Sequence, residues 1–298
     1  MEGSLGIVGA SGFIGRELAR QATAAGWKVC GFSRQARGPG EGIPAWREWS
    51  DHPDFRGLTA LVNLAGEPIN KRWTAANKRR FHDSRIGVTE TLRRGVEKLA
   101  AYERPQVLIN SSAVGIYGDR GDEILEDDAA AGDGYLAQLC RDWEAAADGV
   151  AELGLRVIKW RTGVVLGRDG AAFKQMTLPF RLGLGGRLGS GRQWMPWIHV
   201  EDLVGAILHG IGHASFVGPI NGSAPEPERN ADFTRKLAKA LNRPAFMTVP
   251  PFALKLALGD FGSAVLASHR AVPRALLESG FRFRYPTLEM ALAELVEN

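Results

Sequence analysis

Three glycines near the start of the chain, spaced three residues apart, constrain the fold more than any other feature. They are Gly9, Gly12 and Gly15, between an apolar run at 5–8 and a helical pattern at 16–25. A strand, a glycine turn and a helix in this order form the loop that binds the pyrophosphate of a dinucleotide. The first glycine permits the sharp turn, the second leaves room for phosphate, and the third packs the helix on the strand. The helix N-terminus then offers unpaired N–H groups to the anion.

The spacing of this motif is GxxGxxG, which differs from the GxGxxG of the simplest dinucleotide fingerprint. A glycine triplet alone also occurs in tight turns of unrelated α/β proteins. Its place between a strand and a helix favours the dinucleotide interpretation. The candidate cofactor-binding residues of the loop are Gly9, Ser11, Gly12, Phe13, Ile14 and Gly15.

The rest of the chain alternates apolar runs with helical patterns. The runs lie at 27–32, 58–64, 107–111 and 155–160, and the helical patterns at 73–99 and 135–153. This alternation predicts an α/β fold of the Rossmann type, a doubly wound parallel sheet with helices on both faces. The regularity ends after Gly167, where a glycine-rich stretch follows. We predict an NADP-binding domain at 1–166 and 193–222, and a smaller C-terminal substrate domain at 167–192 and 223–298.

Charge limits the class of ligand. The formal net charge is +4, which suits a small anionic ligand. A nucleic-acid-binding protein more often carries a concentrated stripe of Lys and Arg. The nearest such cluster comprises Lys71, Arg72, residues 78–80 and Arg85. It is either a solvated helix face or a helix that faces phosphate. We predict a small-molecule substrate and no nucleic-acid partner, and a homodimer is one option for the assembly.

The two cysteines, Cys30 and Cys140, stand in apolar patterns and have no CxxC partner. No apolar run reaches the length of a membrane span, and the N-terminus lacks the basic and then apolar pattern of a signal peptide. His, Asp and Glu show no metal-ligand spacing. We therefore predict reduced thiols, a cytoplasmic location, no membrane contact and no metal site.

Ser33 and Arg34 end the second predicted strand. In a dinucleotide fold an acidic residue about 20 positions after the glycine loop binds the ribose 2′-hydroxyl and selects NAD. This chain has no acid there. The guanidinium of Arg34 and the hydroxyl of Ser33 instead offer donors for a 2′-phosphate, which predicts NADP(H). The alternative is that Arg34 is an ordinary surface residue.

Five stretches, 9–15, 63–67, 111–118, 161–167 and 189–202, together resemble one family. They are similar to the short-chain dehydrogenase/reductase superfamily in its extended, epimerase-like form. More narrowly, they resemble the atypical branch described as NAD(P)-dependent sugar-nucleotide epimerases. The tail at 243–295 resembles the C-terminal domain of that branch. The resemblance implies an extended Rossmann fold with NADP(H), and it implies less about the reaction.

The same resemblance implies further cofactor contacts. It places Leu64 and Ala65, after the third strand, at the cofactor, and it places Arg80 and Arg85 near NADP. Val165, after the fifth strand, would line the nicotinamide end.

Catalysis in the superfamily relies on a Ser after the fourth strand and on a Tyr-x-x-x-Lys helix. Here Ser112 is the first candidate and Ser111 the second, and Tyr135 opens the expected helix. Four residues after Tyr135 the chain has Leu139 instead of Lys. A phenol without that neighbour keeps a pKa near 10 and is a poor acid–base group at pH 7. Tyr135 is thus either catalytic or a residue of the core or cleft. Glu144 on the same helix is more simply an exposed residue than a general base.

These observations lead to two hypotheses. The first is an NADP(H)-dependent oxidoreductase or epimerase that acts on a small hydroxyl or carbonyl compound or on a nucleotide-sugar-like substrate. The second is a catalytically degenerate NADPH-binding sensor or regulatory protein. Leu139 favours the second hypothesis, and the cofactor motifs do not distinguish the two.

Overall fold

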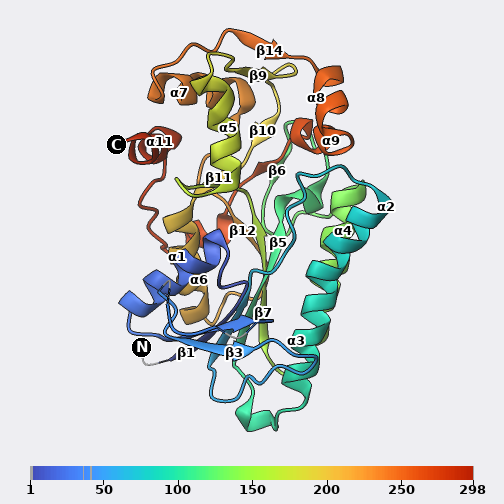
Figure 1. The fold of residues 1–298 in the computed structure, drawn as a ribbon, viewed down its shortest axis with the longest axis vertical. Helices are drawn as coiled ribbons and strands as arrows, with labels where there is room; N and C mark the ends of the chain where they lie inside the picture. The colour runs from blue at the N-terminus through green and yellow to red at the C-terminus, as the bar shows by residue number, and fades with distance from the viewer. Residues whose placement is uncertain (1–2, 36, 41, 298) are drawn as a thin grey trace.

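The computed structural model describes residues 3–35, 37–40 and 42–297. At its centre lies a parallel sheet of seven strands in the order β12-β7-β5-β4-β1-β2-β3 (Figure 1). The strands are β1 (Ser4–Val8), β2 (Lys28–Ser33), β3 (Ala45–Glu48), β4 (Ala60–Asn63), β5 (Val107–Ala113), β7 (Arg156–Thr162) and β12 (Gly218–Gly222). The order reverses between β1 and β4, which is where open α/β sheets bind ligands. The Rossmann-type fold class predicted from the sequence is confirmed.

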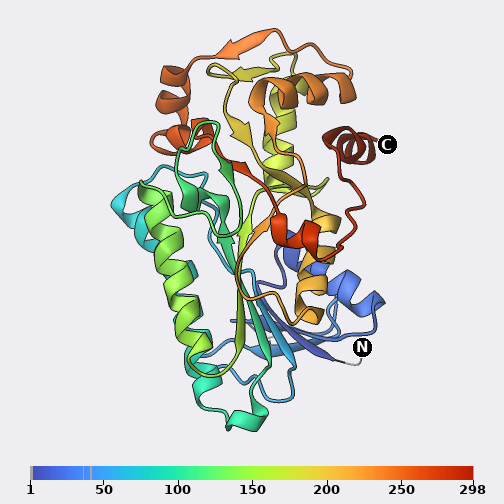
Figure 2. The same ribbon diagram turned by 180° about the vertical axis from the view of Figure 1, so that it is seen from behind.

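Helices cover both faces of this sheet (Figures 1 and 2). On one face α1 (Phe13–Ala24) and α6 (Val200–Gly212) pack against one apolar cluster that includes Ile7, Ile109 and Ile158. On the other face α3 (Val88–Glu97) and α4 (Tyr135–Ala151) pack against a second cluster that includes Leu61 and Leu108. Successive side chains of a strand point to opposite faces, so a strand covered on both sides is apolar throughout. This explains the continuous apolar runs of the sequence.

The long helical pattern at 73–99 is divided in the structure. It forms α2 (Ala75–His82), a π-helical turn, η1 (Asp83–Gly87), and then α3. Thr74 caps α2 by accepting a hydrogen bond from the backbone N–H of Asn77 at 3.2 Å. Single π-helical turns are rare and often mark functional sites. Here the turn carries Arg85.

A second, smaller unit lies above the carboxyl edge of the sheet (Figure 1). It has its own apolar cluster, which includes Phe173, Phe233 and Leu292. Its helices are α5 (Ala171–Arg181), α7 (Asn230–Ala240), α8 (Pro251–Leu258), α9 (Phe261–Leu266) and α11 (Leu288–Val296). Its strand pairs are β9 (Gly186–Leu188) with β14 (Met247–Val249), and β10 (Trp194–Met195) with β13 (Glu228–Arg229).

The chain passes between the two units more than once. β8 (Val164–Leu166) pairs with β11 (Trp197–His199), and β6 (Ile124–Leu125) pairs with β15 (Arg270–Ala271). The following helix, α10 (Arg274–Glu278), returns to the sheet, where Leu276 joins the cluster beneath α6. Two short 3-10 turns, η2 (Ala101–Glu103) and η3 (Val114–Tyr117), flank β5. Among the described residues no helix combines the length and the hydropathy that crossing a membrane requires.

Candidate functional site

The glycine turn after β1 forms an open cradle. Gly9 has a φ of +82°, and the N–H of Gly12 donates to the Gly9 carbonyl at 3.0 Å. A side chain at Gly15 would overlap that same carbonyl, so α1 can approach β1 only through a glycine. Ser11 and Gly12 are exposed, and a Cβ at Gly12 would meet only the Gly9 oxygen, at 3.2 Å. The outer face of Gly12 is therefore free, beside the N-terminus of α1, and this shape fits a pyrophosphate.

Phe13 and Ile14 follow this cradle but point elsewhere. Ile14 packs against the cluster beneath α1. The Phe13 ring lies against the turn after β8, where a side chain at Gly167 would overlap it. A Cβ at Gly170 would lie 3.0 Å from the same ring. Phe13 thus fixes the glycine turn to the start of α5.

The end of β4 adjoins the glycine turn. A Cβ at Gly9 would lie 2.9 Å from the carbonyl carbon of Leu64 and 3.0 Å from the Ala65 nitrogen. Leu64 and Ala65 are half-buried, so each keeps part of its surface free to contact a bound molecule. Asn63 holds this strand end, because its amide donates to Asn110 Oδ1 at 2.8 Å and its Oδ1 accepts from Ala65 N–H at 3.2 Å.

Arg85 and Arg80 lie beside the segment that follows β4, in different environments. The Arg85 guanidinium donates to the carbonyls of Phe81 at 3.2 Å and Glu67 at 3.0 Å. It also lies 5.2 Å from the ring centroid of Trp143, and burial lowers its pKa. Arg85 therefore holds the backbone after β4 in place. Arg80 is exposed on α2.

Ser33 and Arg34 lie at the end of β2, as expected. Arg34 is exposed, and among the described residues its side chain has no hydrogen-bond or ion-pair partner. Ser33 Oγ accepts from Arg37 Nε at 3.2 Å, and the Arg37 guanidinium lies 5.2 Å from the Trp46 ring centroid. Sequence reasoning missed Arg37, which stands in a Gly/Pro-rich loop. The sequence feature that could have pointed to Arg37 is its position four residues after Ser33.

Val165 and Ser111 face the same side of the sheet. Val165 lies on β8, opposite Ile198 of β11, and packs against the cluster that contains Ile109 of β5. Side chains two residues apart on a strand share a face, so Ser111 points to the side of Ile109. Ser111 is half-buried.

Ser112 points to the opposite side, into the protein. It is 3% exposed, and its hydroxyl donates to Glu144 Oε1 at 2.7 Å. Glu144 is only 6% exposed, so the expectation of an exposed helical residue is wrong. The cause is Arg161 of β7, whose Nε and Nη2 donate to the two carboxylate oxygens of Glu144 at 2.9 and 3.0 Å. A buried carboxylate needs such a partner.

This polar network continues through the core. Arg161 Nη1 donates to Tyr117 Oη at 3.1 Å, and Tyr117 Oη donates to Asn221 Oδ1 at 2.7 Å. The Asn221 amide donates in turn to the carbonyls of Leu125 and Val272, both at 3.0 Å. Burial raises the pKa of Tyr117, and Arg161 opposes this effect. Burial alone would lower the pKa of Arg161, but its hydrogen bonds to Glu144 raise it overall. The network ties β5, β7 and β12 to the C-terminal segment.

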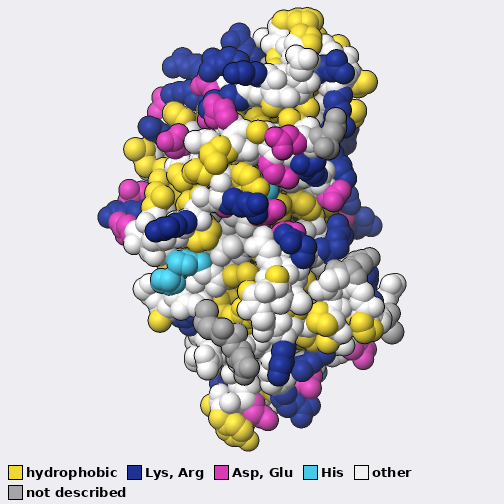
Figure 3. Space-filling model, turned by 90° about the vertical axis from the view of Figure 1, so that its left-hand side faces the viewer, with side chains coloured by type: hydrophobic (Ala, Val, Ile, Leu, Met, Phe, Trp, Pro, Cys, Tyr) yellow, Lys and Arg dark blue, Asp and Glu magenta, His cyan; other side chains and the backbone are white. Residues whose placement is uncertain are grey.

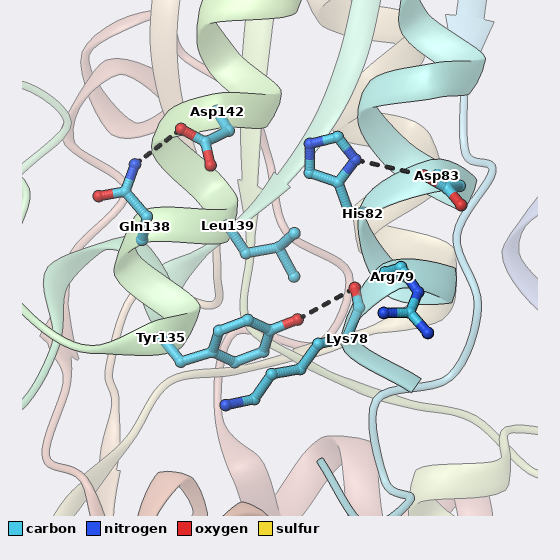
Figure 4. Close-up of a pocket in the computed structure, with 8 residues that line it drawn as sticks. All are labelled: Lys78, Arg79, His82, Asp83, Tyr135, Gln138, Leu139 and Asp142. Carbon is cyan, nitrogen blue, oxygen red and sulfur yellow. Dashed lines mark hydrogen bonds and ion pairs between the residues drawn. The ribbon is translucent and has the colours of Figure 1, made fainter. Parts of the chain in front are cut away.

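Tyr135 points toward α2 (Figure 4). Its hydroxyl donates to the Lys78 carbonyl at 3.5 Å, and the Lys78 ammonium lies 4.6 Å from its ring centroid. Burial raises the pKa of Tyr135, and Arg85 opposes this effect. With Lys78 and Leu139 it lines a cavity of about 280 Å³ between α2 and α4. Among the described residues, Tyr135 forms no hydrogen bond with Ser111 or Ser112.

Besides Glu144, two residues of α4 lie beside the end of β5 and the following turn η3, namely Leu136 and Cys140, one position later than Tyr135 and Leu139. A Cβ at Gly115 would lie 3.4 Å from Leu136 Cβ. Cys140 lies beside Ser112 and Ala113, and burial raises the pKa of its thiol to about 11. Leu139 belongs instead to the cluster of Phe81, Ile86 and Trp143. Near the strand end this helix therefore presents an apolar side chain and a neutral thiol, together with the Glu144 carboxylate that Ser112 and Arg161 already bind.

The surface charge is mixed. Figure 3 shows Lys and Arg side chains gathered over the upper part of one face, whereas the middle of that face carries both signs. In the part of the chain that the structure describes, no group of three or more His, Cys, Asp or Glu side chains is arranged to hold a metal ion.

Comparison with known proteins places the chain in a family. The model of the NAD dependent epimerase/dehydratase family matches residues 5–220, and a domain of unknown function (DUF1731) matches residues 249–295. The Epimerase family protein SDR39U1 homolog, chloroplastic, of Arabidopsis thaliana is 37% identical over 304 residues, which cover 99% of this chain and 87% of that protein. Epimerase family protein YfhF of Bacillus subtilis is 34% identical over 299 residues, which cover 98% of each chain.

A crystal structure of human epimerase family protein SDR39U1 with NADPH superposes with a TM-score of 0.89, at 33% identity and over 99% of each chain. The family match over more than half of the chain, the relatives over nearly its full length and the shared fold agree. This chain belongs to the NAD dependent epimerase/dehydratase family, within the epimerase-like branch of the short-chain dehydrogenases/reductases.

Proposed function

We propose that this protein binds NADP(H) along the carboxyl edge of its sheet and uses it as an oxidoreductase or epimerase. The observation that carries the proposal is the open cradle at Gly12 together with the exposed guanidinium of Arg34 at the end of β2, which has no hydrogen-bond or ion-pair partner among the described residues. The first suits a pyrophosphate and the second a 2′-phosphate. The human relative that was crystallised with NADPH supports the same cofactor.

The residues of the chain suit each part of such a molecule. Gly12 and the N-terminus of α1 would hold the pyrophosphate, and Ser33 and Arg34 would hold the 2′-phosphate. Leu64 and Ala65 offer a half-buried surface beside the cradle, and Val165 lies at the other end of the edge. When bound, a nicotinamide supplies or accepts a hydride at a carbon that bears a hydroxyl or carbonyl group.

One polar group that the chain offers on this face of the sheet is the hydroxyl of Ser111. It shares a face with Ile109, against whose cluster Val165 packs. We propose that Ser111 donates a hydrogen bond to the substrate oxygen. Ser112 is less suited to this role because its hydroxyl already donates a hydrogen bond to Glu144. The substrate is a small hydroxyl or carbonyl compound or a nucleotide-sugar-like molecule.

A second candidate function is an NADPH-binding sensor without turnover. The observation that favours it is the pair Leu136 and Cys140 on the α4 face at the end of β5. Neither residue can take or give a proton near neutral pH, since Leu136 is apolar and the thiol pKa is about 11.

The test has two stages. Purified protein is titrated with NADPH and with NADH by cofactor fluorescence, and we expect NADPH to bind more tightly. NADPH oxidation is then followed with a panel of small carbonyl compounds and nucleotide sugars. Turnover of any member supports the first function, firm NADPH binding without turnover supports the sensor, and equal affinity for both cofactors contradicts the assignment of NADP(H).

A further inference from the structure

Residues 66–74, which we name the strap, join β4 to α2 and touch the smaller unit on the way. Figure 1 shows this segment rising from the sheet toward α8 and α9 before it enters α2. Its first contact is with α5, where the Asn70 side-chain amide donates to Gln175 Oε1 at 3.2 Å. Both side chains are solvent-exposed. The strap thus reaches a helix more than one hundred residues away in the sequence.

The far end of the strap is anchored by aromatic rings. Trp73 lies between Tyr135 of α4 and Phe261 of α9, with ring centroids 4.9 and 6.2 Å away. Its indole N–H donates to the Ile69 carbonyl at 2.9 Å, which holds the strap in a turn. Arg72 adds a long hydrogen bond of 3.4 Å to the Leu256 carbonyl of α8. Tyr135 is therefore part of the anchor of the strap.

These contacts belong to a closed ring of contacting segments, one of which is the glycine turn of the proposed cofactor site. The glycine turn lies against Leu64, two residues before the strap. The strap touches α5 through Asn70 and Gln175. The start of α5, at Gly167 and Gly170, packs on Phe13 and so leads back to the glycine turn. The cradle at Gly12 belongs to this ring of contacts, so opening the ring at the strap would loosen the segments that adjoin the cradle.

We infer that the strap retains the cofactor and that the contact between Asn70 and Gln175 is the point at which the ring opens. This inference rests on the proposed function. The other contacts of the ring involve backbone and half-buried apolar groups. The Asn70–Gln175 contact is a single hydrogen bond between neutral, exposed side chains, which exchange such bonds readily with water. Trp73 stays in place while the Asn70 end moves.

The first experiment measures cofactor release. Gln175→Ala should speed the dissociation of NADPH about threefold to tenfold, the range that one net hydrogen bond supports. The rate is read by stopped-flow fluorescence, in which bound NADPH is displaced by excess NADP⁺. Lys174→Ala is the matched control, since Lys174 is the adjacent exposed residue of α5 and pairs with Asp169. Equal release rates in wild type and Gln175→Ala contradict the inference.

The second experiment closes the ring covalently. The double variant Asn70→Cys/Gln175→Cys is cross-linked with a short bis-maleimide, for which the buried Cys30 and Cys140 do not compete. Cross-linking with NADPH present should slow release at least about tenfold, and cross-linking without it should slow binding to the same degree. The control is Asp232→Cys/Arg235→Cys on α7, which uses the same reagent outside the ring.

The outcomes separate the two proposals. If wild type binds NADPH and the cross-linked ring exchanges it at the wild-type rate, the strap inference is wrong and the proposed function stands. If wild type binds no NADPH, the proposed function is wrong and the strap loses its role with it. If NADPH exchange slows in the cross-linked Asn70→Cys/Gln175→Cys variant and not in the cross-linked α7 control, both the strap inference and the proposed function are supported.

Discussion

The hydroxyl of Ser112 donates to Glu144 Oε1 at 2.7 Å, and the same carboxylate is held by two nitrogens of Arg161. This contact commits Ser112 to the interior. Its neighbour Ser111 faces the opposite side of β5, toward the cluster against which Val165 packs. The two adjacent serines therefore differ in surroundings because they differ in face.

We expect the two alanine variants of these serines to separate activity from stability. Ser112→Ala should lower the free energy of unfolding by about 1 kcal/mol, because Glu144 keeps its pair with Arg161. Ser111→Ala should leave stability unchanged and lower substrate turnover by about 100-fold, the effect of removing one hydrogen bond to a reacting oxygen. Urea unfolding and NADPH oxidation measure the two effects. The reverse pattern would return the catalytic role to Ser112.

Tyr135→Phe should leave turnover at neutral pH unchanged. In the part of the chain that the structure describes, the one hydrogen bond of the hydroxyl that it removes goes to the Lys78 carbonyl, at 3.5 Å. The net cost in stability should be below about 1 kcal/mol. Steady-state rates of wild type and variant, measured with the same substrate between pH 7 and 10, test this expectation. A large loss of rate at pH 7 would establish Tyr135 as the proton donor.

Leu139→Lys should destabilise the protein and should not restore activity. Leu139 is 5% exposed in an apolar cluster with Phe81, Ile86 and Trp143. A lysine there loses this apolar packing, and the acids Asp83 and Asp142, which line the same cavity, only partly balance its charge, so we expect a cost of about 1–3 kcal/mol. Leu139→Met, which keeps the volume, should cost less than about 1.5 kcal/mol. Chemical denaturation measures the free energy of unfolding of both variants. A gain of turnover in Leu139→Lys would contradict the placement of residue 139 away from the reacting groups.

Arg34→Ala should weaken NADPH binding by about 1.5–3 kcal/mol, the range for a hydrogen bond to a charged group, and should barely change NADH binding. The reason is that only NADPH carries the 2′-phosphate. Arg235→Ala is the control, because Arg235 is an exposed arginine of α7 with a side chain that is 74% exposed. Titration by fluorescence measures all four affinities. An equal loss for both cofactors would place Arg34 away from the 2′-phosphate.

Gly12→Val should abolish cofactor binding and leave the fold intact. Gly12 has φ −73° and ψ 169°, an extended conformation that valine adopts readily. The new Cβ would meet only the Gly9 oxygen at 3.2 Å, so the branched side chain projects into the cradle. Circular dichroism and thermal unfolding should match wild type, while NADPH titration shows no binding. Tight binding by a folded variant would mean that the cofactor lies elsewhere.

Acid should destabilise the protein through His269, whose pKa burial lowers from 6.5 to about 4. Between these values the unfolded chain binds a proton that the folded chain does not, so the free energy of unfolding falls as the pH drops from about 7 to about 4. Below about pH 4 the folded and unfolded chains both bind this proton, so His269 causes no further loss of stability. The variant His269→Gln should show a flatter stability profile from pH 7 to 5. Identical slopes in the two proteins would exclude His269 as the cause.

The fold class and the glycine turn could be predicted from the sequence because their signals are local. The glycine spacing, the strand before it and the helix after it are local features, and the turn at Gly9 and the cradle at Gly12 follow from the same few residues. The alternation of apolar runs was sufficient for the parallel sheet because strands buried on both faces read as continuous apolar segments. β3, a short and half-exposed edge strand, carries no such signal and was not predicted.

Only the tertiary structure decided which side chains face one another. Adjacent residues of a helix point about 100° apart, so moving from Tyr135 to Leu136 changes the residue that meets β5. The sequence pattern contains Tyr135 and Leu139 but not the rotation of α4, which is set by the packing of Leu139, Cys140 and Ala147. Glu144 is buried because Arg161, seventeen residues away on β7, pairs with it. The strap meets α5 because the chain folds back after β8, and no local pattern encodes that contact.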